Sequence, residues 1–132
     1  MVQIVGSYEP LSKDNLVEYL KSFNVSEEIA QMLAASKSPV VISDLDSEKV
    51  TVTNEGTPTT FVFGKELDIT LPTGQQIKTT VTIDGDSLTF KTVYADNASV
   101  FENKVYQFTN EGLTSTLVNH KNLKAVVQYK RL

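Results

Sequence analysis

The stretch that decides the fold is residues 13–36, KDNLVEYLKSFNVSEEIAQMLAAS, because it alone predicts helix. Before Asn24 and after Ser26, apolar residues recur at steps of three and four, which is the period of an α-helix. Asn24 tolerates the left-handed conformation that ends a helix, and Ser26 is a typical N-cap with Glu27 and Glu28 behind it. The stretch therefore predicts two short helices joined by a turn.

Outside this stretch the apolar pattern changes to a period of two, which is typical of strands. A first strand is expected at residues 2–8, where Gly6 permits a bend, before Pro10 ends it and Ser12 caps the next element. Turn signals rich in Gly, Asn, Asp and Pro separate the other candidates, which are 40–43, 49–53, 59–63, 67–71, 77–83, 87–94, 100–108, 113–118 and 123–129. Short connections between them predict an antiparallel meander.

A single helical insert within this series of strands predicts a mainly β fold. We expect a ten-stranded antiparallel up-and-down barrel closed by a helix-turn-helix lid, with space inside for a small molecule. No long linker, low-complexity tract or internal repeat interrupts the pattern. One domain spanning residues 1–132 is therefore expected.

The composition is that of an ordinary globular protein, with 40% apolar and 21% charged residues. A net charge of −4 argues against nucleic acid or an anionic membrane as the partner, because both attract basic surfaces. The absence of cysteine excludes disulfides and thiolate metal sites. The chain shows neither a leader-like start nor an apolar run of membrane-spanning length, so we expect a cytoplasmic protein without stable membrane insertion.

Several motifs follow one another along the whole chain: Gly6-Ser7-Tyr8, Asn15-Leu16-Val17-Glu18-Tyr19-Leu20, Lys37-Ser38-Pro39, Phe61-x-x-Gly64-Lys65-Glu66-Leu67-Asp68, Val81-x-Ile83-Asp84-Gly85-Asp86 and Tyr129-Lys130-Arg131-Leu132. Their order and spacing resemble the intracellular lipid-binding proteins, which comprise the fatty-acid-binding and the cellular retinoid-binding proteins. The resemblance implies a monomeric carrier of a fatty acid, retinoid, carotenoid or related lipophilic molecule. We also expect no enzymatic activity and no cofactor.

The chain departs from that family at the ligand head group. Fatty-acid binders of the family typically hold the ligand carboxylate with two interior arginines and a tyrosine, but this chain has one arginine, Arg131. Alignment on the last strand puts Val127 at one arginine position and leaves Tyr129 as the surviving tyrosine. Alignment of the preceding hairpin puts Tyr106 at the other arginine position, or Gln107 if the register slips by one residue. These four residues, Tyr129, Tyr106, Val127 and Gln107, are therefore ligand-binding candidates, and Leu117 is predicted as a fifth.

Alternation along the last strand supports this register there, because Ala125, Val127 and Tyr129 share one face while Lys124, Gln128 and Lys130 share the other, with Val126 as the exception on the outer face. The preceding strand gives no such help, since both of its faces mix polar and apolar residues.

Two interpretations of the ligand follow. In the first, the head group is neutral or weakly polar, as in a retinol, carotenoid, sterol-like or ester-type molecule. In the second, it is a fatty-acid carboxylate held by Tyr106, Tyr129, ordered water or Lys104. The first is favoured, because a hydroxyl contributes roughly half of what a charge-assisted hydrogen bond contributes and poorly offsets the burial of a carboxylate.

A different class of function keeps the fold without transport: a structural or interaction barrel whose cavity is filled or vestigial. Catalysis has no support, because His120 is the only histidine and stands in a turn-like setting without a Ser-His-acid pattern. The chain also contains no complete calcium loop, so no metal ligands are predicted.

Overall fold

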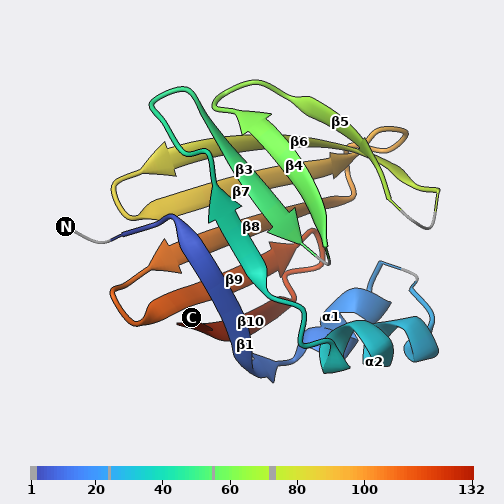
Figure 1. Ribbon diagram of the computed structural model, residues 1–132. Helices are drawn as coiled ribbons and strands as arrows, with labels where there is room; N and C mark the ends of the chain where they lie inside the picture. The colour runs from blue at the N-terminus through green and yellow to red at the C-terminus, as the bar shows by residue number, and fades with distance from the viewer. Residues whose placement is uncertain (1–2, 24, 55, 72–73) are drawn as a thin grey trace.

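The computed structural model describes residues 3–23, 25–54, 56–71 and 74–132 of the chain. Ten antiparallel strands form one sheet in the order β4-β3-β2-β1-β10-β9-β8-β7-β6-β5. The sheet curls into a nearly closed barrel, and both helices lie together near one opening, on the side away from the chain termini (Figure 1). This confirms the predicted up-and-down barrel with a helix-turn-helix lid.

The predicted strands after residue 36 agree with the structure to within two residues at each end. The helices are α1 (Leu16–Lys21) and α2 (Glu27–Ala35). The strands are β1 (Gly6–Asp14), β2 (Val40–Ser43), β3 (Lys49–Asn54), β4 (Thr57–Val62), β5 (Leu67–Thr70), β6 (Gln76–Asp84), β7 (Ser87–Tyr94), β8 (Phe101–Phe108), β9 (Gly112–Asn119) and β10 (Lys124–Arg131).

The prediction for the first strand was wrong at both ends. β1 begins at Gly6 and continues through Pro10 to Asp14. Pro10 is tolerated because the pairing of β1 with β10 shifts between Pro10 and Ser12, and such a bulge accommodates a residue without an N–H. Ser12 therefore pairs with Gln128 within the sheet and caps no helix.

The lid helices begin in two different ways. Ser26 caps α2 as predicted, because its Oγ accepts a hydrogen bond from the Ile29 N–H at 3.3 Å. The N-cap of α1 is Asn15, whose side chain instead donates from Nδ2 to the Lys124 carbonyl of β10 at 2.9 Å. Asn24, the predicted helix breaker, lies outside the described residues. Within them no helix is long and apolar enough to cross a membrane.

The core consists of inward-facing apolar side chains from most strands. Its buried members are Ile4, Tyr8, Val40, Ile42, Val50, Val52, Phe61, Val81, Leu88, Phe90, Tyr106, Phe108 and Leu113. In the sheet order β4 and β5 are the two edge strands, and they are not paired with each other. On this side of the barrel the Gly64 N–H, between β4 and β5, donates to the Val81 carbonyl of β6 at 2.9 Å. Burial of this cluster supplies the main stabilisation of the barrel.

The one arginine of the chain, Arg131, fastens the N-terminal segment to the last strand. Arg131 Nη1 donates to the Val5 carbonyl at 3.2 Å, and Nη2 donates to the Gln3 carbonyl and, at 2.8 Å, to the Tyr8 hydroxyl. Its guanidinium lies 4.9 Å from the centroid of the Tyr8 ring. These contacts tie together the first described residues and the last strand.

We expect Arg131→Met to lower the free energy of unfolding by about 2 kcal/mol, because several hydrogen bonds and a cation–π contact are lost together. Urea denaturation followed by circular dichroism measures this. Lys130→Met is the matched control: Lys130 is exposed and makes one ion pair, with Glu9 at 3.7 Å, so its loss costs less than about 0.5 kcal/mol. Equal losses in the two variants would contradict the assigned role of Arg131.

Candidate functional site

The candidate site lies on the inner face of strands β8, β9 and β10, where side chains from neighbouring strands form cross-strand rows. One row places Tyr106 of β8 opposite Ser115 of β9, which in turn lies opposite Val127 of β10. The next row, toward the lid, places Lys104 opposite Leu117 and Leu117 opposite Ala125. The ligand-binding candidates from strands β8 to β10 are thus brought to one surface, with one exception.

That exception is Gln107. It is exposed, and its Oε1 accepts a hydrogen bond from the Ser87 hydroxyl of β7 at 2.6 Å. Tyr106, by contrast, is 1% exposed and packs edge-on against the Phe90 ring at 4.9 Å between centroids. The structure therefore selects the register with Tyr106 inside the barrel and Gln107 outside it.

The other candidates differ in how much surface they retain. Val127 is buried, while Leu117 is half-buried on the same inner face. Tyr129 is half-buried as well and packs against the core, opposite Leu113. Their position fits a role in lining a ligand, and that role remains a prediction.

Lys104 is an inward-facing cation of this surface, on the β8 strand. Its Nζ lies 4.6 Å from the centroid of the Phe90 ring and 5.0 Å from that of Tyr106. Among residues 3–23, 25–54, 56–71 and 74–132, no carboxylate lies within the 4.0 Å of a salt bridge with it. The ammonium is thus held by aromatic faces while its charge lacks a directly paired anion.

Burial disfavours the charged form of Lys104, but the neighbouring Tyr106 and the Glu102 carboxylate outweigh that effect. Together they raise the pKa of Lys104 above its ordinary value. A lysine with a raised pKa keeps its proton at neutral pH. The inner face of the barrel therefore presents a positive charge at neutral pH beside apolar surface.

Glu102 is the acidic side chain closest to Lys104 along β8, and it is fastened to the lid. The two residues are separated by one position and so point to the same face of the strand. The hydroxyl of Tyr19, in α1, donates to Glu102 Oε2 at 2.9 Å, and Tyr19 is completely buried. Burial and the adjacent Glu102 carboxylate raise the pKa of Tyr19, so its hydroxyl remains a donor.

A second contact fastens the same helix. Buried Asn119, at the end of β9, donates from Nδ2 to the Ser22 hydroxyl at 2.5 Å. His120 follows it, and its ring lies 5.6 Å from that of Phe23. The described residues contain no group of three or more His, Cys, Asp or Glu side chains arranged to hold a metal.

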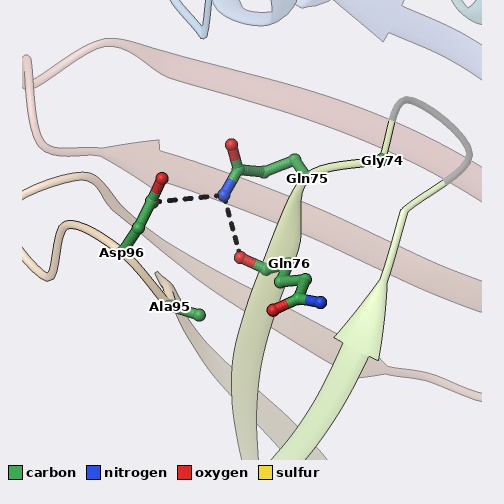
Figure 2. Close-up of a pocket in the computed structure, with 5 residues that line it drawn as sticks. All are labelled: Gly74, Gln75, Gln76, Ala95 and Asp96. Atoms are coloured by element: carbon green, nitrogen blue, oxygen red, sulfur yellow. Dashed lines mark hydrogen bonds between the residues drawn. The ribbon is translucent and has the colours of Figure 1, made fainter.

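A surface pocket of about 220 Å³ lies elsewhere, at the turns that join β5 to β6 and β7 to β8. Figure 2 shows Gln75 bridging this pocket, with Nε2 donating to the Asp96 carboxylate at 3.3 Å and to the Gln76 carbonyl at 2.9 Å. Its lining is mostly polar and belongs to the exposed rim. A lipophilic ligand gains little by burial there, so we place the candidate site on the inner face instead.

The sequence predicts Lys104 only as one alternative partner of a carboxylate, and it predicts no role for Glu102 or Tyr19. The alternation of Glu102, Lys104, Tyr106 and Phe108 was available as a signal, since these four residues share one strand face. In the sequence, Tyr19 stands only within the predicted helical stretch and the motif at residues 15–20. Its contact with Glu102 spans 83 residues of sequence, and no local pattern predicts such a contact.

The fold defines a class: small antiparallel β-barrels with a helix-turn-helix lid. No family model matches the chain. A fatty acid-binding protein of Tyrophagus putrescentiae is 30% identical over 135 residues, covering 99% of each chain. One of Clonorchis sinensis is 28% identical, again over 99% of each chain.

Solved structures share this fold. A Schistosoma mansoni fatty acid binding protein in complex with arachidonic acid superposes with a TM-score of 0.85 at 22% identity, covering 97% of this chain and 95% of that one. A fatty-acid-binding protein from brain tissue of Drosophila melanogaster gives a TM-score of 0.80 at 26% identity, covering 97% and 99%. The chain belongs to the fatty-acid-binding protein family, within the intracellular lipid-binding proteins.

Proposed function

We propose that this protein is a non-enzymatic cytoplasmic carrier of a fatty acid, and that Lys104 supplies the positive charge for the ligand carboxylate. The observation that carries the proposal is the inward-facing Lys104 ammonium without a salt-bridge partner among the described residues. Burying a carboxylate costs free energy unless a cation pairs with it. An inward-facing ammonium that forms no salt bridge can supply that pairing.

Tyr106 adds a hydroxyl beside Lys104, and the aromatic face of Phe90 offers apolar surface for the first methylene groups of the chain. Lysine presents a compact point charge, whereas arginine presents a planar fork that matches a carboxylate with two parallel bonds. We therefore expect the head group to be held with less directional precision than an arginine pair would impose.

The relatives favour the same ligand class, since they are named as fatty acid-binding proteins and one is solved with arachidonic acid. The alternative of a neutral head group, such as a retinol or carotenoid, loses one support because Gln107 is on the outside. The alternative of a filled, structural barrel is disfavoured by inward side chains that stay half-buried near the lid, including Lys104 and Leu117.

The test is direct binding to delipidated protein, with lauric acid and lauryl alcohol as a matched pair and retinol as a third ligand. Displacement of an environment-sensitive dye and native mass spectrometry provide the affinity and the stoichiometry. We expect one lauric acid per protein and tighter binding of the acid than of the alcohol. Tighter binding of the alcohol or of retinol would instead support a ligand with a neutral head group. Binding of none of the three would contradict the proposed carrier function.

The affinity for lauric acid should stay constant between about pH 7 and pH 9. The raised pKa of Lys104 keeps the ammonium protonated throughout that range, and the free fatty acid is already ionised. The affinity should fall only when the pH rises through the pKa of Lys104. A steep loss of affinity below about pH 9 would contradict a raised pKa, and the alcohol serves as the pH-independent control.

A further inference from the structure

The carboxylate of Glu102 is a natural competitor for the Lys104 ammonium. The two side chains leave the same face of β8 from positions about 7 Å apart along the strand, and both are long enough to meet. A carboxylate and an ammonium in a poorly solvated interior attract each other strongly. Nevertheless they form no salt bridge, as Lys104 is in none among the described residues.

What holds Glu102 in place is the Tyr19 hydroxyl, which donates to Oε2 at 2.9 Å. Tyr19 is completely buried, and its ring lies 5.5 Å from that of Phe23, so its own position is fixed by packing within the lid. Tyr94, at the end of β7, lies near the same carboxylate: burial raises the pKa of Tyr94, and the charges of Asp96 and then Glu102 raise it further. In the described residues Tyr94 makes no side-chain hydrogen bond to Glu102, which leaves Tyr19 as the residue that positions the carboxylate.

We propose that Tyr19 is a specificity-determining positioning residue: its hydroxyl holds Glu102 away from Lys104 and so leaves the ammonium available for the carboxylate of the cargo. This inference rests on the proposed function, because it assumes that Lys104 binds the cargo. Since Tyr19 belongs to α1, the protein's preference for a charged ligand depends on the lid. A residue outside the barrel wall thus sets which ligand the protein selects.

The test measures the ratio of lauric acid affinity to lauryl alcohol affinity in a set of variants. Tyr19→Phe keeps the ring and removes the hydroxyl, so Glu102 turns to Lys104 and competes with the acid. We expect about a tenfold loss of acid affinity, the size of one charge-assisted hydrogen bond, with the alcohol affected less than about twofold. In the double variant Tyr19→Phe with Glu102→Gln, the competing charge is gone and acid affinity returns to within about threefold of the wild type.

Tyr94→Phe is the matched control, because it removes a tyrosine hydroxyl near the same carboxylate without a hydrogen bond to it; the ratio should not change. An equal loss for acid and alcohol in Tyr19→Phe would mean a structural role only, and a failed rescue in the double variant would overturn the competition by Glu102. If Lys104→Met weakens acid binding but Tyr19→Phe leaves the ratio unchanged, only the role of Tyr19 is contradicted. If wild-type protein binds no acid, both the proposed function and the role of Tyr19 are contradicted.

Discussion

Replacing Lys104 by methionine is expected to lower the affinity for lauric acid by roughly ten- to a hundredfold while leaving the affinity for lauryl alcohol within about twofold of the wild type. The substitution removes the inward cation and preserves most of the apolar stem that packs near Phe90. The acid must then bury its carboxylate against apolar surface and hydroxyl groups alone. Dye displacement with both ligands measures the change.

Two comparisons make this result specific. Lys91→Met, on the neighbouring strand β7, removes a lysine whose side chain is exposed, so both affinities should remain unchanged. The alcohol reports whether the Lys104→Met barrel is still folded and able to bind. A parallel loss for acid and alcohol would show that Lys104 serves packing, and an unchanged acid affinity would remove it from the site.

Gly112→Ala is expected to have the largest effect on stability, a loss of about 3 kcal/mol or more in the free energy of unfolding. Gly112 opens β9 opposite Lys130 of β10. A β-carbon built there collides with the Tyr129 carbonyl oxygen and comes within 3.0 Å of the Lys130 α-carbon. These are backbone atoms of a paired strand, so relief requires moving β9 away from β10.

Such a movement would also disturb the turn before β9, where the Thr109 N–H donates to the Gly112 carbonyl at 2.8 Å. Urea denaturation measures the loss. Gly85→Ala provides the control: its φ of 58° is left-handed, but an added β-carbon meets nothing within 4 Å, so only the backbone strain of about 1 kcal/mol is expected. Equal costs at the two glycines would show that the close approach at Gly112 relaxes easily.

Most of the β architecture could be predicted from the sequence because a barrel strand repeats a local rule. Alternation put Ala125, Val127 and Tyr129 on one face of β10, and the structure buries the first two and packs the third against the core. The prediction for the first strand was wrong for a local reason as well. A proline ends most strands, but here a β-bulge accommodates Pro10. The candidate site was harder, because both faces of β8 carry polar residues and the register at Tyr106 stayed open.

The sequence by itself determined the number and order of the strands, the helical lid, and the lack of a second arginine. Only the tertiary structure decided that Tyr106 points inward and Gln107 outward, that Arg131 fastens the N-terminal segment, and that Lys104 lacks a salt bridge among the described residues. Periodicity is a property of neighbouring residues, whereas the charge state and partners of a side chain depend on what distant segments bring beside it. The contact of Tyr19 with Glu102 exists only once the lid closes over the barrel.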